Sequence, residues 1–271
     1  MEYKQIGNAE IPVLGLGTWE IGGRFEADHS QKQNSIEIIK QAIELGITHI
    51  DTSEIYGNGF TEELIAEAIS SFDRKKLFIT SKVWSNHLNY DATIKALHSS
   101  LKRLKTDYLD LYVIHKPGKD MDLKGTMEAL GHLNEQNLIR AIGVSNLTEQ
   151  QISDAQKFLN NSRISAVQNE YNLLKRDEEI IELCNKNDIL FIAYRPLKRG
   201  QLAKPGIPLL DRLAKKYNKT QSQIALNWLI SKPKIVAIPK ATKKEHLQDN
   251  LGSIGWKMED QDYEALDKIN Q

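Results

Sequence analysis

The amino-acid sequence predicts an α/β fold, a (β/α)8 or TIM barrel, on three observations. Short apolar runs alternate with longer segments of helical periodicity eight times along the chain. The chain has 271 residues, and barrels of this kind commonly have about 250. No linker rich in proline, glycine or serine interrupts the alternation, so we expect residues 1–271 to form a single domain.

The predicted strands are apolar runs of a length typical of buried strands. They are residues 13–19, 47–52, 77–83, 108–115, 139–146, 164–171, 190–197 and 235–241. Strands that alternate with helices pair in parallel through right-handed crossovers, and an unbroken series of such units favours a closed barrel over an open sheet. Before them, residues 3–15 (YKQIGNAEIPVLG) predict an N-terminal β-hairpin.

The segments between the runs predict helices, because their apolar residues recur with a period near 3.6. Eight of them follow strands, at residues 31–45, 60–71, 91–104, 123–137, 148–159, 177–187, 207–217 and 243–251. We expect Asp91, Thr148 and Asp177 to cap three of these helices. Two extra helices, at residues 220–232 and 258–270, fall outside the rhythm.

Composition and charge favour a cytoplasmic protein whose partners are small molecules. The 36 basic and 36 acidic side chains balance, so no net positive field attracts nucleic acid or an anionic membrane. The N-terminus lacks the apolar segment of a signal peptide, and no run approaches the roughly 18 apolar residues of a membrane span. The single cysteine, Cys184, has no partner for an internal disulfide and is expected to pack among apolar neighbours. We expect a monomer.

Polar residues close most of the predicted strands, at the end where a barrel of this kind has its active site. Any one of them is explained more simply as a strand end that meets solvent. Such an ending on seven strands makes a shared site the better interpretation. The residues are Asp51 with Tyr56 in the following loop, Lys82, His115, Ser145 and Asn146, Gln168 and Asn169, Tyr194 and Arg195, and Lys240.

Four of these residues suit the transfer of a proton to a carbonyl oxygen. A tyrosine has a reference pKa of about 10, and a nearby cation lowers that pKa toward the range of an efficient donor. We expect Lys82 to supply this cation to Tyr56, with Asp51 as the counter-ion of Lys82. His115 is expected to orient the substrate oxygen or to share its proton. The sequence shows no metal-ligand spacing, no activated serine or cysteine and no carboxylate pair, so no metal is expected.

Eight short motifs resemble those of the aldo-keto reductases, in the order and spacing of that family over nearly the whole chain. They are GLGTW (15–19), HIDTSEIYGNG (49–59), FITSKVW (78–84), LDLYVIHKP (109–117), IGVSN (142–146), VQNEYN (167–172), AYRPL (193–197) and IPKA (238–241). The segment YGNGFTEE (56–63) and the short loops resemble prokaryotic members. The resemblance implies an enzyme that reduces aldehydes or ketones to alcohols, with Tyr56 as the general acid. The implied catalytic tetrad is Asp51, Tyr56, Lys82 and His115.

The same resemblance implies NADPH or NADP+ as the cofactor, with NADH as a weaker alternative. Ser145, Asn146 and Gln168 match residues that hold the nicotinamide carboxamide, and Tyr194 matches the ring that stacks on the nicotinamide. Lys240 matches the lysine that meets the 2′-phosphate. Further cofactor contacts are implied for Arg195, Leu197, Ala241, Thr242, His246, Asp249 and Asn250.

Several positions depart from the pattern of the family near the adenosine end of the cofactor. Ala241 stands where many relatives have serine, and His246 stands where they place an arginine for the 2′-phosphate. Arg195 replaces the usual serine. Lys240 and the neighbouring Lys243 and Lys244 still favour NADP(H), because each adds a positive charge near the expected phosphate.

The substrate pocket is implied by Trp19, Trp84 and His115, which match wall positions of the family, although isolated tryptophans also serve as core residues. Lys116 stands where a tryptophan is common, which makes that side of the pocket more polar. The sequence ends at Gln271 without the C-terminal loop that shapes specificity in many relatives. An open and permissive site is therefore expected.

Two other functions remain open for the same barrel. One is a regulatory or sensor protein that binds a nicotinamide cofactor and turns over slowly. The other is an isomerase or aldolase that uses Lys82 as a Schiff base, although this leaves Tyr194, Gln168 and Lys240 without a role.

Overall fold

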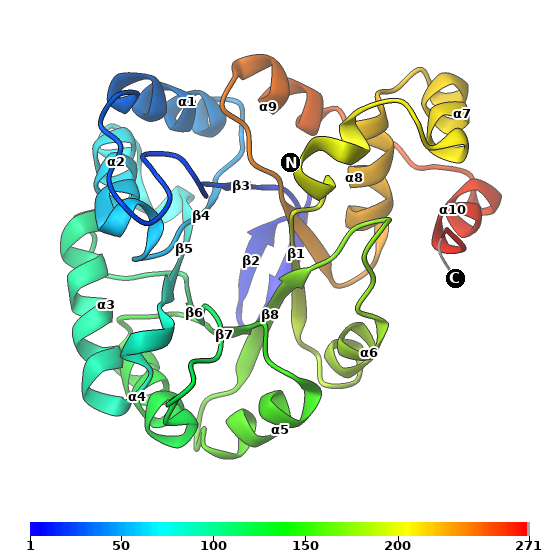
Figure 1. The fold of residues 1–271 in the computed structure, drawn as a ribbon. Helices are drawn as coiled ribbons and strands as arrows, with labels where there is room; N and C mark the ends of the chain where they lie inside the picture. Colours follow the sequence, from blue (N-terminus) through cyan, green and yellow to red (C-terminus); the bar gives the residue numbers. More distant parts are fainter. Residues whose placement is uncertain (270–271) are drawn as a thin grey trace.

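The computed structural model describes residues 1–269 as a ring of eight parallel strands with helices around it (Figure 1). The strands follow one another around the ring in chain order. They are β3 (Gly15–Gly17), β4 (His49–Asp51), β5 (Phe78–Val83), β6 (Leu111–Ile114), β7 (Ile142–Ser145), β8 (Ile164–Glu170), β9 (Leu190–Tyr194) and β10 (Ile235–Ile238). The predicted (β/α)8 fold is therefore confirmed.

The ring closes between the first and last of these strands. The backbone N–H of Ala237 donates to the carbonyl of Val13 at 2.9 Å, and the N–H of Gly17 donates to the carbonyl of Pro239 at 3.2 Å. A side chain on Gly17 would place its Cβ 2.8 Å from the carbonyl oxygen of Ile238, so only glycine lets the two strands approach this closely.

The helices form the outer layer of the barrel. They are α1 (Lys32–Glu44), α2 (Phe60–Ile69), α3 (Tyr90–Leu104), α4 (Leu123–Glu135), α5 (Glu149–Lys157), α6 (Glu178–Lys186), α7 (Pro208–Tyr217), α8 (Gln221–Ser231), α9 (Lys244–Leu251) and α10 (Asp260–Asp267). Four 3-10 turns lie in the connections, η1 (Tyr56–Gly59), η2 (Arg74–Lys76), η3 (Ser85–His87) and η4 (Lys198–Ala203). None of the helices within residues 1–269 is both long and apolar enough to cross a bilayer.

The helix caps agree with the prediction at one of three positions. Thr148 and Gln151 form a reciprocal capping box on α5. For α3 the cap is Asn89, whose side chain accepts from the N–H of Ala92, and the predicted Asp91 lies inside the first turn. Asp177 occupies the cap position of α6, but its carboxylate accepts a hydrogen bond from Asn169 at 2.7 Å and does not cap the backbone.

The prediction chose the wrong one of two consecutive helices as the extra one. Helix α8 packs against β10 and buries Ile224, Leu226 and Trp228, so it belongs to the ring around the barrel. Helix α7 lies outside this ring, beyond α8 (Figure 1). Periodicity does not distinguish the two helices, whereas the nearly continuous apolar surface of α8 is typical of a buried helix. The second extra helix is α10, and the predicted end at residue 270 lies outside the described residues.

The predicted N-terminal hairpin is confirmed and covers the end of the barrel where the strands begin. It consists of β1 (Tyr3–Ile6) and β2 (Ala9–Pro12), paired in antiparallel register. Ile6 and Ile11 are fully buried and form an apolar cluster with residues of the barrel interior. The other members of this cluster include Phe78, Leu111, Val113, Leu190, Ile192 and Val236.

Lys4 fastens the hairpin to the barrel through hydrogen bonds to the main chain. Its ammonium donates to the carbonyls of Ile230 at 2.7 Å and Ile235 at 2.6 Å, and also to the carbonyl of Lys232. These acceptors lie at the end of α8 and at the start of β10. One side chain thus satisfies carbonyl groups that helix termination leaves without a partner.

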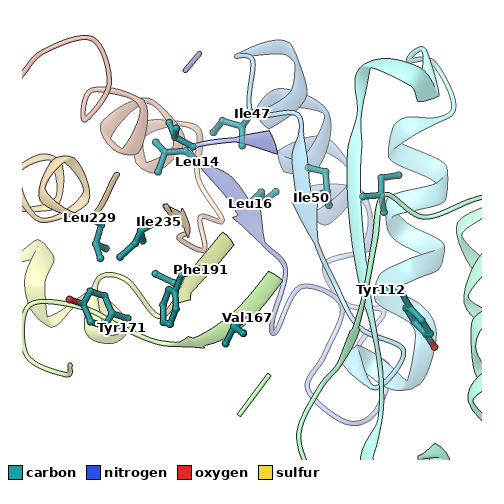
Figure 2. Close-up of a cluster of buried hydrophobic side chains, with 14 of the residues drawn as sticks. Leu14, Leu16, Ile47, Ile50, Tyr112, Val167, Tyr171, Phe191, Leu229 and Ile235 are labelled. Carbon is teal, nitrogen blue, oxygen red and sulfur yellow. The ribbon is translucent and has the colours of Figure 1, made fainter. Parts of the chain in front are cut away.

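The larger core lies between the strands and the helices. Figure 2 shows Phe191 and Val167 among these buried side chains, with Leu229 and Ile235 nearby. Tyr171 stacks on the indole of Trp228 with ring centroids 5.7 Å apart, and Cys184 is buried as predicted. This packing fixes the strands, so residues at their C-terminal ends are held on a rigid frame.

Candidate active site

The centre of the site is an ion pair between neighbouring strands. Asp51 ends β4 and Lys82 lies in β5, and both side chains are buried. The Lys82 Nζ donates to Asp51 Oδ1 at 2.5 Å and to the carbonyl of Thr52 at 2.7 Å. Burial lowers the pKa of Lys82, and the Asp51 carboxylate opposes that change by favouring the charged form.

Tyr56 reaches this pair from the turn that follows β4. Its hydroxyl lies 3.5 Å from the Lys82 Nζ, and its side chain is only 7% exposed. The turn requires left-handed backbone at Gly57 (φ 56°) and Asn58 (φ 53°). A Cβ at Gly57 would lie 2.5 Å from the carbonyl oxygen of Gly22, so glycine is needed to bring Tyr56 to this place.

The electrostatic environment of Tyr56 differs from the expectation that Lys82 lowers its pKa. Burial raises the pKa of Tyr56 well above its usual value, the charge of Asp51 raises it further, and Arg195 lowers it. The expectation considered the charge of Lys82, whereas burial is the main cause and the charge of Asp51 acts in the same direction as burial. The phenol is therefore protonated near neutral pH and is available as a hydrogen-bond and proton donor.

His115 follows β6 and faces the same centre. Its Nδ1 lies 2.8 Å from the Ser53 hydroxyl, and its ring centroid lies 5.6 Å from that of Tyr56. Burial, followed by the charges of Lys82 and Lys116, lowers the pKa of His115 well below its usual value. The imidazole is consequently neutral, which suits a hydrogen bond to a substrate oxygen better than the delivery of a proton from an imidazolium.

Gln168 connects this centre with the residues expected to hold the cofactor. Its side-chain amide donates to Asp51 Oδ2 at 2.8 Å, and its main-chain carbonyl accepts from the hydroxyl of Ser145. Asn146 has left-handed backbone (φ 59°) and donates to the Ser145 hydroxyl at 2.8 Å. The hydroxyl of Tyr194 donates to Asn146 Oδ1 at 2.8 Å. The structure thus joins all four predicted nicotinamide contacts in one hydrogen-bonded set beside Asp51.

Asn169, the other polar residue predicted at the end of β8, has a structural role. Its side-chain oxygen accepts from the N–H of Asn146 at 2.8 Å, and its amide donates to Asp177. It therefore fixes the turn that presents Asn146.

Arg195 and Leu197 lie in the turn that follows β9. Arg195 has left-handed backbone (φ 48°) and donates to Glu170 Oε2 at 3.1 Å. The carbonyl of Leu197 accepts from the N–H of Leu202 in η4. The structure places both residues next to Tyr194, at the rim.

The adenosine-end residues gather at the start of α9. Thr242 and His246 are exposed, whereas Ala241 and Asn250 are buried. Lys243 occupies the cap position without a side-chain cap, so the first-turn N–H groups have no side-chain acceptor there and fit an anionic phosphate. Asp249 is engaged elsewhere, because its carboxylate accepts from the Thr220 hydroxyl at 2.8 Å.

Lys240 has a partner that the sequence did not indicate. Its ammonium lies 2.7 Å from Glu20 Oε2, and Glu20 also accepts from Arg24 at 2.7 Å. Its contacts with the positively charged Lys240 and Arg24 hold the pKa of Glu20 below its usual value. The contact joins residues 220 positions apart in the chain, and only the three-dimensional fold reveals it.

Aromatic side chains surround the exposed side of Tyr56 and His115. Trp19 lies edge-on to Tyr56 at 4.9 Å between ring centroids, and Trp84 lies edge-on to His115 at 5.1 Å. The structure thus brings both predicted pocket tryptophans to the centre. Phe25 contacts both tryptophans. The sequence prediction did not include it, although a lone aromatic residue in the charged segment GRFEAD (23–28) is a signal that could have indicated a site residue.

Glu54 is a second residue of the site that was not predicted from the sequence. Its carboxylate accepts from the N–H of Trp84 at 2.6 Å and contacts His87 Nδ1 at 3.0 Å. It therefore positions the backbone of Trp84 relative to Tyr56. Within residues 1–269, no group of three or more metal-ligating side chains is arranged to hold a metal ion.

The fold and this rim define an α/β-barrel protein with a buried, protonated tyrosine at the mouth of the barrel. A model of the family described as "Aldo/keto reductase family" matches residues 13–271. The chain belongs to this family.

Relatives and solved structures match the chain over almost its whole length. The glyoxal reductase of Bacillus subtilis (strain 168) is 35% identical, covering 97% of this chain and 90% of that enzyme. The methylglyoxal reductase YeaE of Escherichia coli (strain K12) is 32% identical, covering 99% and 95%. The crystal structure of the thermostable aldo-keto reductase Tm1743 with the inhibitor epalrestat has a TM-score of 0.95 at 44% identity, covering all of both chains. An aldo-keto reductase from Klebsiella pneumoniae in complex with NADPH has a TM-score of 0.88 at 31% identity, covering 99% and 95%.

Proposed function

We propose that this protein reduces the carbonyl group of small aldehydes and ketones with NADPH, and that Tyr56 is the general acid. The observation that carries the proposal is the buried phenol of Tyr56, 3.5 Å from the Lys82 ammonium and beside a neutral His115. Family membership and the complexes of related enzymes with NADP and NADPH support the choice of cofactor.

The proposed reaction divides between the cofactor and the side chains of the rim. NADPH, when bound, supplies a hydride to the carbonyl carbon. Tyr56 donates its phenolic proton to the carbonyl oxygen, so that the product is a neutral alcohol. The ammonium of Lys82 stabilises the phenolate that remains, and solvent returns a proton to it afterwards.

The remaining polar residues orient the reactants in this proposal. His115 holds the substrate oxygen next to Tyr56 through its ring nitrogen. Ser145, Asn146 and Gln168 hold the nicotinamide carboxamide, and Tyr194 packs against the ring of the nicotinamide. Gln168 then links the cofactor to Asp51 directly.

Lys82 is poorly placed for the alternative of Schiff-base chemistry. Its ammonium is fully buried and hydrogen-bonded to Asp51 and to the carbonyl of Thr52. A nucleophilic amine has to lose its proton and reach the substrate, and both partners favour the protonated form. Proton transfer through Tyr56 therefore fits the geometry better.

The test of the proposal is the variant Tyr56→Phe, assayed with methylglyoxal and 4-nitrobenzaldehyde. We expect turnover to fall by roughly 10²–10⁴-fold, the usual contribution of a general acid, with little change in NADPH affinity. Tyr3→Phe is the matched control, because Tyr3 is exposed at the opposite end of the barrel. Near-normal turnover in Tyr56→Phe would refute the role of Tyr56, and wild-type protein that binds NADPH without turnover would favour the sensor function.

A further inference from the structure

Five side chains at the rim form a closed series of ring contacts. Tyr56 contacts Trp19, Trp19 contacts Phe25, Phe25 contacts Trp84, Trp84 contacts His115, and His115 contacts Tyr56. The centroid distances lie between 4.9 and 6.3 Å. We call these five residues the aromatic cluster. It contains the proposed proton donor and its neutral histidine, so a substrate that reaches Tyr56 also meets the other rings.

Phe25 is the outermost member of the aromatic cluster. It is 56% exposed, and only two other large apolar side chains in residues 1–269 are comparably exposed. Those two, Met1 and Tyr3, lie by the hairpin at the other end of the barrel. An exposed aromatic ring beside a reaction centre offers an apolar surface to a flat part of a ligand.

Lys116 adds a positive charge at the edge of the aromatic cluster. Its ammonium lies 4.4 Å from the ring centroid of Trp84, and its charge is one of the causes that lower the pKa of His115. It therefore lies close to the reaction centre. The contact with the indole is weak at an exposed position, so an anion can replace it.

Four other cations of the rim are already paired with carboxylates. Lys82 pairs with Asp51, and Lys240 pairs with Glu20. Arg195 and Lys198 both pair with Glu170. Within the described part of the chain, no carboxylate lies within ion-pairing distance of the Lys116 ammonium. Lys116 is thus the cation next to His115 that is available to a ligand.

We propose that the preferred substrates are aryl or similarly flat aldehydes and ketones that carry a carboxylate on the side away from the carbonyl. The inference rests on the proposed function and specifies its substrate class. The carbonyl oxygen meets Tyr56 and His115, the flat group packs against Phe25 and the two tryptophans, and the carboxylate pairs with Lys116. The chemistry is the same hydride and proton transfer, and the carboxylate takes no part in it.

The experiment compares 4-carboxybenzaldehyde with its methyl ester, methyl 4-formylbenzoate, at saturating NADPH. The two aldehydes have similar shape, but the ester is the more electrophilic, so the recognition of charge is measured as the difference in their ratio of kcat/KM between the wild-type protein and Lys116→Met. We expect the ratio of kcat/KM for acid over ester to be about 3- to 10-fold higher in the wild-type protein than in Lys116→Met, the scale of a partly exposed ion pair. Added NaCl should reduce the ratio, because salt screens exposed charges.

Variants of Lys116 assign this preference to one side chain. Lys116→Met should lower the ratio of kcat/KM for acid over ester by this factor, whereas Lys116→Arg should retain the wild-type ratio. Lys119→Met is the matched control, since Lys119 is an exposed lysine of the same loop, and it should keep the wild-type ratio. Phe25→Ala should raise KM for both aryl aldehydes more than KM for methylglyoxal.

The outcomes separate this inference from the proposed function. An unchanged ratio of kcat/KM for acid over ester in Lys116→Met overturns the substrate class while the reductase function stands. Failure to reduce any of these carbonyl compounds with NADPH bound overturns both.

Discussion

The two ends of the barrel treat buried polar groups in different ways. Where the strands begin, Lys4 donates to three main-chain carbonyls, and Asp110 pairs with Arg74 and Arg140, which both lie over the ring of Tyr108. Where the strands end, Lys82 and Asp51 are buried together. Left-handed backbone at non-glycine residues occurs at both ends, at Asn58, Asn146 and Arg195 after the strands and at Lys105, Asn137 and Asp188 before them. The fully buried ion pair of Lys82 and Asp51 lies at the end that carries the proposed chemistry, and we expect the polar groups at the other end to serve stability.

The largest effect that would test this contrast is expected for Lys82→Met. Turnover should fall by roughly 100-fold or more, because Tyr56 loses the cation that stabilises its phenolate. The variant also leaves Asp51 buried without a counter-ion, which lowers the free energy of unfolding by about 3–5 kcal/mol. Steady-state kinetics and urea unfolding measure the two effects.

The double variant Lys82→Met/Asp51→Asn separates stability from activity. It removes both charges, so most of the lost stability should return while turnover stays low. A double variant as unstable as Lys82→Met would show that the ion pair itself stabilises the fold, in addition to any role in catalysis.

At the opposite end, Lys4→Met should affect stability alone. The carbonyls of Ile230, Lys232 and Ile235 would lose their shared donor, and we expect a loss of about 1–3 kcal/mol in the free energy of unfolding. Turnover should be unchanged at temperatures below unfolding. Lys124→Met on the exposed surface of α4 is the control and should lie within about 0.5 kcal/mol of wild type. A fall in turnover for Lys4→Met without loss of stability would contradict the contrast.

A smaller effect, on the affinity for NADPH, is expected for Lys240→Ala. The dissociation constant for NADPH should rise by about tenfold, the low end for a charge-assisted contact, because Lys240 must first leave Glu20. The constant for NADH should hardly change. Fluorescence titration of both cofactors checks this, and equal losses would assign Lys240 to the pyrophosphate or to the fold.

The smallest expected effect concerns the pH profile of reduction. Because the pKa of His115 is held well below its usual value, the rate should show no histidine-dependent limb between pH 6 and pH 8. Because the pKa of Tyr56 is raised, loss of its proton should not limit the rate below pH 10. Lys116→Met removes a positive charge beside His115, so its acid limb should move to higher pH. Stopped-flow measurement of NADPH oxidation extended below pH 6 would detect the change.

The sequence predicted the barrel and its rim well because both depend on local patterns. Alternating apolar runs placed all eight strands, and the polar residue at each strand end is brought to one rim by parallel pairing alone. The four tetrad residues therefore met as expected.

The features that were missed depend on contacts across the fold. Glu20 and Lys240 meet only because β3 and β10 close the barrel. The direction of the pKa shift of Tyr56 depends on burial and on the charge of Asp51, which a linear pattern does not report. The exchange of α7 and α8 arose because helical periodicity gives the buried face of a helix without saying which layer it joins.

The hairpin also makes the molecule easy to attach to a surface in one orientation. Tyr3 is exposed on β1, at the end of the barrel away from Tyr56 and Phe25. The only cysteine of the sequence, Cys184, is buried, and burial raises the pKa of its thiol to about 12, so it reacts poorly with thiol reagents. A Tyr3→Cys variant would therefore carry a single reactive thiol. Coupled through it to an electrode or a bead, the protein would present its open rim to the solution.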